Sequence, residues 1–243
     1  MSYVLIVGAK SDIARAIARE YAKHGYDLYL AARNVSELEE FTKDITIRTQ
    51  RTVKLVELDI LNYKSHQSFY DNLEEQPFGV ISAIGYLGEQ EKAQSDFDEA
   101  ERIMDTNYTG LVSLFNIIAD NFEKRRSGFM LGISSVAGDR GRKSNYIYGS
   151  AKAALTAYLS GLRNRLYGAN VHVLTVKPGF VATKMTKDMD LPKKLTAQPD
   201  EVAEDIYNAQ QIGKNVLYTK WFWRWLMLII KMIPERKFKD LNI

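Results

Sequence analysis

Short runs of β-branched and aliphatic residues alternate with longer amphipathic stretches along the whole chain of 243 residues. Such alternation is typical of a parallel sheet whose strands are joined by crossover helices. Because no linker rich in Pro, Gly or Ser interrupts it, the pattern predicts one doubly wound α/β domain with a seven-stranded parallel sheet. The expected strands are Tyr3–Val7, Asp27–Ala31, Val53–Glu57, Val80–Ala83, Phe129–Ile133, His172–Val176 and Val216–Tyr218. The expected helices are Asp12–His24, Ser36–Arg48, Tyr63–Leu73, Asp96–Arg126 with a break near Asn107, Tyr148–Leu166 and Asp200–Ile212.

The composition argues against several classes of function. A formal net charge of +3 is too small to indicate nucleic-acid binding. The absence of cysteine excludes disulfides and thiolate sites, and three scattered histidines do not favour a metal centre. The N-terminal stretch MSYVLIVGAK lacks the charged region and long apolar core of a signal peptide. We therefore expect a cytoplasmic protein that binds neither a metal nor nucleic acid.

The first expected strand leads directly into VGAKSDIA, residues 7 to 14. In a dinucleotide fold, glycines here form a tight turn and let backbone N–H groups approach the pyrophosphate at a helix N-terminus. Gly8 is present, whereas Asp12 and Ala14 occupy the other two glycine positions, and we interpret Asp12 as the helix N-cap. The alternative is a turn that binds nothing. The candidates for dinucleotide contact are Gly8, Lys10, Ser11, Asp12 and Ile13.

The end of the second strand indicates which dinucleotide is bound. A fold that selects NAD usually places an acid here to hold the ribose 2′-hydroxyl, but this chain has two alanines and then Arg33. A guanidinium without a neighbouring acid suits a 2′-phosphate, and Lys10 supplies a second cation. The sequence therefore favours NADP; the alternative is that both cations are solvated loop charges. After the third strand, Asp59 and Ile60 are placed to meet the adenine, unless Asp59 is a helix cap.

Polar groups suited to catalysis follow in the second half of the chain. They are Asn107 in DTNYTG, Ser135 in GISSVAG, and the pair Tyr148 and Lys152 in YGSAK. Residues four positions apart share one face of a helix. A nearby ammonium favours the phenolate and lowers the pKa of a tyrosine toward the range useful for proton transfer. The pair therefore predicts an acid–base site.

The order and spacing of these groups resemble the short-chain dehydrogenase/reductase family over essentially the whole chain. The segment PGFVAT, residues 178 to 183, follows the sixth expected strand as in that family. The resemblance implies a Rossmann fold, a nicotinamide cofactor and reduction of a ketone, with Tyr148 protonating the forming alkoxide. It also implies that Ser135 holds the carbonyl oxygen, that Lys152 grips the nicotinamide ribose, and that Asn107 interrupts its helix to hold a water in the proton relay. The cofactor contacts that it adds are Gly85, Tyr148, Lys152, Pro178, Gly179, Val181 and Thr183.

Two neighbours compete for these roles, and one motif departs from the family. Ser134 competes with Ser135 but has the wrong spacing, and Tyr146 competes with Tyr148 but has no lysine four residues later. The family typically reads N-N-A-G after the fourth strand, where this chain reads S-A-I-G, residues 82 to 85. The glycine remains, so we expect backbone-mediated cofactor binding to survive with different local hydrogen bonds.

Other segments resemble one branch of the family. The motif GA-x-SDIA, the segment GYLGEQ after the fourth strand and a tryptophan-rich basic C-terminus are similar to the decaprenylphosphoryl-2-ketoribose reductase branch. Enzymes of that branch reduce a keto-sugar carried on a polyprenyl phosphate. The resemblance implies a lipid-linked ketone substrate and makes Gln90 a candidate for contact with the sugar; the alternative is a polar loop residue.

The stretch KWFWRWLMLIIKMIP near the C-terminus differs from everything before it. It is too short and too interrupted by charges to span a membrane, which needs about 20 predominantly apolar residues. At about 100° per residue, Lys220, Arg224 and Lys231 fall on one narrow helix face, with tryptophans and aliphatic residues around the rest. This pattern is typical of an interfacial anchor, so we expect Trp221–Ile233 to touch the inner membrane face. The alternative is burial against the domain or a second subunit of a homo-oligomer.

The sequence thus predicts an NADP-binding catalytic domain over residues 1–219 and an amphipathic tail over residues 220–243. The leading hypothesis is an NADPH-dependent ketone reductase that acts on a lipid-linked keto-sugar. A second hypothesis is a soluble reductase of a small ketone or acyl substrate, with the tail completing a core or a subunit interface. A third is a nucleotide-sensing or partner-binding module without catalysis. The complete catalytic set argues against the third, because a binding module does not need all four groups.

Overall fold

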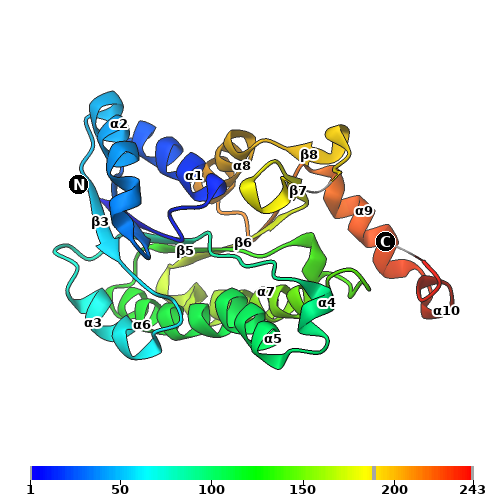
Figure 1. Ribbon diagram of the computed structural model, residues 1–243. Helices are drawn as coiled ribbons and strands as arrows, with labels where there is room; N and C mark the ends of the chain where they lie inside the picture. Colours follow the sequence, from blue (N-terminus) through cyan, green and yellow to red (C-terminus); the bar gives the residue numbers. More distant parts are fainter. Residues whose placement is uncertain (1, 188–189, 242–243) are drawn as a thin grey trace.

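Seven parallel strands form the central sheet, as the sequence predicts (Figure 1). The computed structural model describes residues 2–187 and 190–241. All neighbouring strands of this sheet pair in parallel, so the doubly wound α/β architecture is confirmed. In spatial order the strands are β3 (Val53–Glu57), β2 (Asp27–Ala32), β1 (Tyr3–Val7), β4 (Gly79–Ser82), β5 (Phe129–Ile133), β6 (His172–Pro178) and β9 (Val216–Thr219).

Helices cover both faces of the sheet. β1 and β2 are buried along their whole length, as expected of parallel strands enclosed on both sides. The covering helices are α1 (Asp12–Lys23), α2 (Glu39–Thr49), α3 (His66–Asp71), α6 (Gly110–Arg125), α7 (Tyr146–Leu166) and α8 (Pro199–Gln211). Figure 1 shows α1, α2 and α8 on one face and α3, α6 and α7 on the other. Each layer encloses an apolar cluster of its own with the sheet.

The chain connections diverge at the centre of the sheet, where β1 and β4 lie side by side. After β1 the chain crosses to β2 on one side, and after β4 it crosses to β5 on the other. Divergence at the carboxyl ends of adjacent strands leaves a crevice, which is where open α/β sheets bind their ligands. The turns after β1, β4, β5 and β6 all reach this edge, so the motifs that follow these strands come together there.

The helix expected over residues 96–126 is interrupted near Asn107, as predicted. A wide π-type turn at Asp105–Thr109 separates α5 (Phe97–Met104) from α6. Such turns are rare and frequently occur at functional sites. Between β6 and α8, two further short strands, β7 (Phe180–Val181) and β8 (Thr196–Ala197), pair in parallel and form a small second sheet.

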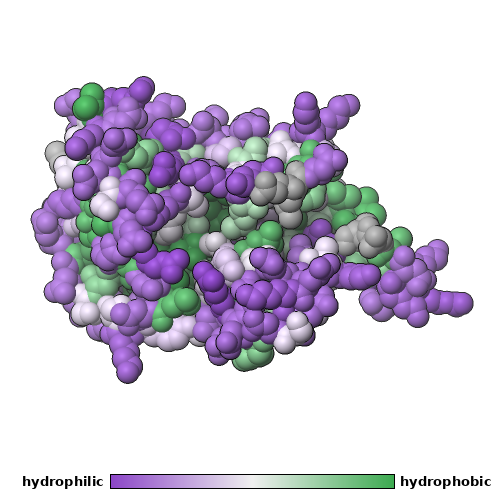
Figure 2. Space-filling model, viewed as in Figure 1, coloured by the Kyte–Doolittle hydropathy of each residue, from purple (hydrophilic) through white to green (hydrophobic). Residues whose placement is uncertain are grey.

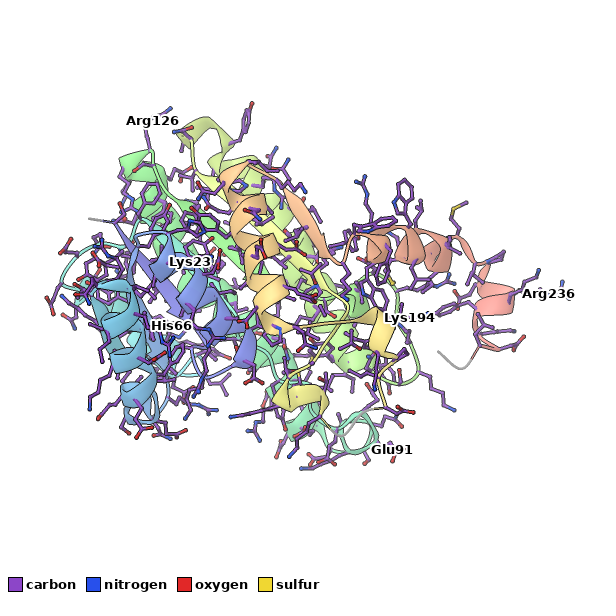
Figure 3. All side chains as sticks on the ribbon, turned by 90° about the horizontal axis from the view of Figure 1, so that it is seen from above. Lys23, His66, Glu91, Arg126, Lys194 and Arg236 are labelled. Atoms are coloured by element: carbon purple, nitrogen blue, oxygen red, sulfur yellow. The ribbon has the colours of Figure 1, made fainter. Side chains whose placement is uncertain are left out.

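The tail forms α9 (Phe222–Met232) and α10 (Glu235–Phe238). Figure 3 shows this segment extending away from the rest of the domain, with Arg236 at its far end. Among the described residues, no helix is both long and apolar enough to cross a membrane. The sequence places Lys220 on the cationic stripe of this helix, but the residue precedes α9 and has a φ of +56°. The helical stripe is therefore restricted to Arg224 and Lys231.

One side of α9 packs against the domain. Trp223 and Met227 are buried together with Val136, which lies just after β5. Phe180 and Leu195 pack against the same cluster from the segment between β6 and α8. The alternative interpretation of the tail, burial against the domain, therefore holds for this side of the helix.

Candidate active site

A glycine in the turn after β1 lets the backbone pass close to the segment that follows β4. Gly8 has a φ of +83°, which side chains disfavour, and a Cβ there would lie 2.9 Å from the backbone nitrogen of Ile84. The Gly8 N–H is bound to the carbonyl of Ala31 at 2.9 Å. The N-terminus of α1 consequently lies at the edge of a cleft of about 620 Å³, and a helix N-terminus is suited to binding phosphate.

The first turn of α1 differs from the predicted arrangement. Ser11 is the N-cap, and its Oγ accepts a hydrogen bond from the Ala14 N–H at 3.1 Å. Asp12 is instead the first residue of the helix, and its carboxylate accepts a hydrogen bond from the Lys184 N–H at 2.7 Å. The prediction that Asp12 caps the helix is therefore wrong. The acid fastens the segment after Thr183 to α1.

Two cations predicted to hold a 2′-phosphate, Lys10 and Arg33, line the outer end of the cleft. Lys10 Nζ donates to the Arg33 carbonyl at 3.2 Å and pairs with Glu37 at 2.6 Å. A second acid, Glu57, accepts a hydrogen bond from the Asn34 N–H at 2.7 Å. The local motif does not reveal these acids, because they come from the following helical turn and from β3. Arg33 is the more exposed of the two cations, whereas Lys10 forms a salt bridge with Glu37.

The cleft leads inward to a second cavity of about 350 Å³. Asp59 and Ile60 line the cleft, and Asp59 Oδ1 accepts a hydrogen bond from the Leu61 N–H at 3.0 Å. Asp59 therefore stabilises a turn and does not cap a helix. Gly85 and Ser11 line both spaces. Two adjoining spaces with a shared wall suit a dinucleotide whose two ends are bound apart.

The second cavity collects most of the residues predicted to perform chemistry. Ser135, Tyr148 and Lys152 line it, although they come from the end of β5 and from α7. Figure 2 shows a hollow between the two helical layers on this face, with hydrophobic residues inside it. The predicted cofactor residues on the cavity wall are Lys10, Ser11, Asp12, Ile13, Gly85, Pro178, Gly179, Val181 and Thr183.

Lys152 is buried between the ends of two central strands and is only 1% exposed. Its Nζ donates to the carbonyls of Ile133 at 3.0 Å and Ile84 at 3.3 Å. Burial disfavours the charged form and lowers the pKa of Lys152 to about 7. The same nitrogen lies 5.6 Å from the ring centre of Tyr148. The amine is therefore fixed beside the phenol.

The phenol of Tyr148 does not have the lowered pKa that the sequence predicts. Burial raises the pKa of Tyr148 to about 12, and a hydrogen bond from the Ser135 hydroxyl opposes this rise. Lys152 does not reverse it, because burial also weakens the charge on the lysine. Tyr148 therefore keeps its proton at neutral pH.

The competing serine and tyrosine have other environments. Ser134 Oγ donates to the Lys152 carbonyl at 2.8 Å and lies 2.8 Å from Thr156 Oγ1. Its hydroxyl thus holds α7 against the end of β5. Tyr146 is exposed at the start of α7. Both observations agree with the predicted preference for Ser135 and Tyr148.

Two predicted polar residues, Asn107 and Gln90, form hydrogen bonds with backbone groups near the site. Asn107 is fully buried, and its amide donates to the carbonyls of Ile103 at 2.8 Å and Tyr86 at 2.6 Å. Gln90 Oε1 accepts a hydrogen bond from the Ile147 N–H at 3.1 Å, so it caps the first turn of α7. Gln90 thus contacts the helix that carries Tyr148, and its contact with a sugar stays a prediction.

Other residues of the cavity wall were not among the predicted site residues. They include Leu87, Arg142, Asn145, Phe180, Met185 and Trp223. Trp223 comes from the tail, and no local pattern places it here. Its indole lies directly on Gly179, where a Cβ would overlap it, and it packs edge-on against Phe180 with ring centres 5.4 Å apart. The tail helix thus contributes one wall of the cavity.

The segment after Ser135 is fastened to the tail and to the sheet. Arg140 pairs with Glu235 at 3.0 Å and donates to carbonyl oxygens at the C-terminal end of α9. Asp139 is bound on one side by Lys177 and on the other by the Tyr218 hydroxyl at 2.9 Å. The position of this segment therefore depends on β6, β9 and α9 together.

A glycine turn at a helix N-terminus, an elongated cleft and a serine–tyrosine–lysine group at its inner end are the features of a nicotinamide-dependent oxidoreductase. Within residues 2–187 and 190–241, no group of three or more side chains is arranged to hold a metal ion. The family model for short chain dehydrogenases matches residues 2–194. The chain therefore belongs to the short-chain dehydrogenase family, as its motifs predict.

Individual proteins agree with this assignment. The chain is 35% identical to an uncharacterized oxidoreductase of Mycobacterium tuberculosis, with 96% of this chain and 94% of that protein covered. It is 32% identical to an uncharacterized oxidoreductase of Streptomyces coelicolor, with 99% and 96% covered. A short-chain dehydrogenase from Sphingobium yanoikuyae, solved in complex with NADPH, has the same fold with a TM-score of 0.83 at 22% identity, covering 97% of each chain.

The buried lysine should leave a measurable mark on stability. Its pKa of about 7 lies below the ordinary value of 10.5, so the unfolded chain binds more protons between these values and stability rises with pH. Between about pH 7.5 and 9.5 this difference should raise the free energy of unfolding by about 2 kcal/mol. Urea unfolding of the unliganded protein should show this slope, and Lys152→Met should remove it. Lys143→Met, an exposed control, should keep it; equal slopes for the native protein and Lys152→Met would contradict the burial argument.

Proposed function

We propose that this protein is an NADPH-dependent carbonyl reductase in which Tyr148 is the general acid. The observation that carries the proposal is a single cavity lined by Ser135, Tyr148 and Lys152, which shares wall residues Ser11 and Gly85 with the cleft at Gly8. When bound, the nicotinamide supplies a hydride to the carbonyl carbon. The arrangement of the protein's own groups accounts for the other requirements of the reaction.

Each catalytic side chain has a separate task. Tyr148 gives its phenolic proton to the carbonyl oxygen as charge develops there, and Ser135 donates a hydrogen bond to the same oxygen. Lys152 uses two of its protons on backbone carbonyls, which leaves one N–H for the nicotinamide ribose. The amide of Asn107 is occupied by backbone groups, so the widened turn around it, and not its side chain, would hold the water that restores the Tyr148 proton.

Removing the phenolic hydroxyl tests the reaction. Tyr148→Phe should lower kcat by about 100- to 10,000-fold, the usual value of general acid catalysis, while NADPH affinity stays nearly unchanged. NADPH oxidation with a panel of ketones, with and without detergent-dispersed polyprenyl substrates, measures the first quantity, and fluorescence titration measures the second. Tyr146→Phe is the matched control and should retain full activity. Most of the activity remaining in Tyr148→Phe would refute the role of this residue.

The preference for NADPH is assigned to Arg33. This guanidinium is exposed at the mouth of the cleft, directly after β2, where a 2′-phosphate would lie. Glu37 competes for Lys10, so Arg33 is the main determinant and Lys10 an auxiliary one.

Arg33→Ala should weaken NADPH binding by about 1.5–3 kcal/mol, the scale of a hydrogen bond to a charged group. The affinity for NADH should change little, because NADH has no 2′-phosphate. Calorimetric titration of both cofactors measures this difference, with Lys43→Ala as an exposed control. Equal affinities of the native protein for NADPH and NADH would exclude the assignment.

The substrate class follows from the cavity wall and the tail. Phe180, Met185 and Trp223 give the cavity an apolar part in addition to its polar catalytic groups. We assign it a ketone with a large apolar part, and the resemblance to the ketoribose reductase branch makes a keto-sugar on a polyprenyl phosphate the leading candidate. A small soluble ketone is the alternative, and the packing of Trp223 into the domain is the observation that favours it.

The outer side of α9 supports contact with a lipid surface. Trp225, Ile229 and Met232 are 55%, 63% and 74% exposed, and Leu228 is also exposed. Arg224 and Lys231 flank this arc, and the residues after the helix include three more cations. An exposed apolar arc beside cations suits an anionic membrane surface. We therefore propose that α9 lies on the inner membrane face and presents the cavity to a membrane-borne substrate.

Vesicle binding distinguishes this surface from a subunit interface. The native protein should sediment with anionic vesicles at low salt, and Trp225→Ser/Ile229→Ser should reduce binding by more than about tenfold, since burying each side chain contributes on the order of 1.5 kcal/mol. Ile47→Ser/Tyr167→Ser, which removes exposed apolar residues elsewhere, is the control. A native protein that ignores vesicles and forms an oligomer broken by the α9 variant would assign the arc to a homo-oligomer interface.

A further inference from the structure

Arg142 lies on the wall of the substrate cavity and has few partners of its own. It belongs to the segment between the Ser135 turn and α7. Its Nη2 donates to the Val136 carbonyl at 3.3 Å, which is a long hydrogen bond. Its Nε is buried and has no hydrogen-bond partner among residues 2–187 and 190–241. Burial also lowers the pKa of Arg142, with nearby Asp139 opposing the shift. The guanidinium is thus partly desolvated, and no salt bridge to a carboxylate is present for it among the described residues.

Asp139 offsets part of this cost through its charge, but its two oxygens are held by other groups, one by Lys177 and the other by the Tyr218 hydroxyl. Buried polar groups in proteins are normally paired, and an unpaired one at a cavity calls for a ligand that completes it. A planar guanidinium with free N–H groups matches a carboxylate or a phosphate.

The charge balance of the cavity agrees with an anionic ligand. Its described wall carries Arg142 and Lys184, together with Lys10, which is paired with Glu37, and Lys152, whose pKa is lowered to about 7. The acid on that wall is Asp12, whose carboxylate is engaged by the Lys184 N–H. Asn145, three residues before Tyr148, adds a buried Oδ1 that has no partner in the described chain and can accept a bond from a hydroxyl group.

We propose that Arg142 binds an anionic group, a carboxylate or a phosphate, carried by the ketone that is reduced at Tyr148. Asn145 accepts a hydrogen bond from a hydroxyl on the same polar part of the substrate, and Phe180, Met185 and Trp223 contact its apolar part. Arg142 is thereby a specificity-determining residue. This inference rests on the proposed carbonyl reduction, because that reaction makes the ligand a ketone. Anion binding by Arg142 is testable without turnover.

The binding experiment uses the protein saturated with NADPH, so that the 2′-phosphate site is occupied. Calorimetric titration with inorganic phosphate, and separately with acetate, should show binding to the native complex and at least tenfold weaker binding to Arg142→Gln. Arg142→Lys should recover part of it, and Lys143→Gln, which removes an adjacent exposed charge, should bind as the native protein does. The stronger of the two anions identifies the group. Equal binding by Arg142→Gln and the native complex would overturn the proposal.

The kinetic experiment compares acetophenone with 4-acetylbenzoate and 4-acetylphenyl phosphate. The native protein should favour one of the charged ketones in kcat/KM, and Arg142→Gln should lose at least tenfold of that preference. An equal loss for charged and neutral ketones would show that Arg142 only supports the Ser135 segment, and would overturn the proposal. If none of the ketones is reduced, the calorimetric result still decides whether Arg142 binds anions, while the proposed reductase activity fails on its own test.

Discussion

The buried amine of Lys152 is the interaction on which the arrangement of the site depends. It bridges carbonyls at the ends of β4 and β5, so it joins the two central strands at the edge where the motifs meet. The same contact fixes the rotation of α7, which carries Tyr148 one helical turn earlier. Taking an amine out of water is unfavourable, and two carbonyl acceptors offset only part of that cost. This cost of burial lowers the pKa of Lys152, and burial likewise raises the pKa of the neighbouring Tyr148, which keeps its proton.

A parallel sheet explains why groups so distant in sequence share one cavity. Every strand of the sheet ends at the same edge, so Gly8, Gly85, Ser135 and Pro178 arrive there from four different strands. The segment following Ser135 needs further support because it leaves the sheet. Asp139 connects it to β6 and β9, and Arg140 connects it to the end of α9. Arg140 therefore joins the segment after Ser135 to the tail helix across 90 positions of the chain.

The tail helix has three sides with different surroundings. Trp223 and Met227 face the domain, Arg224 and Lys231 face solvent, and Trp225 and Ile229 form part of an exposed apolar arc. A helix that merely completed a core would need only the first side. A free membrane anchor would not place an indole on Gly179 at the wall of the cavity that Ser135 and Tyr148 line. The same helix therefore carries a residue of the cavity wall, Trp223, and an exposed apolar arc that includes Trp225 and Ile229.

The sequence by itself predicted the sheet, its helices and the interruption at Asn107, and it proposed Ser135, Tyr148 and Lys152 as the candidate catalytic group, which the fold brings to one cavity. These follow from periodicity and from spacing along one strand or helix, which are local properties of the chain. It could not determine that Ser11 caps α1 while Asp12 binds Lys184, that Glu37 competes for Lys10, or that Gln90 caps α7, because each of these contacts joins a residue to a partner chosen by the fold. The direction of the Tyr148 pKa shift and the place of Arg142 and Trp223 on the cavity wall were likewise decided only by tertiary structure. Burial and long-range packing set them, and neither is encoded in the spacing of neighbouring residues.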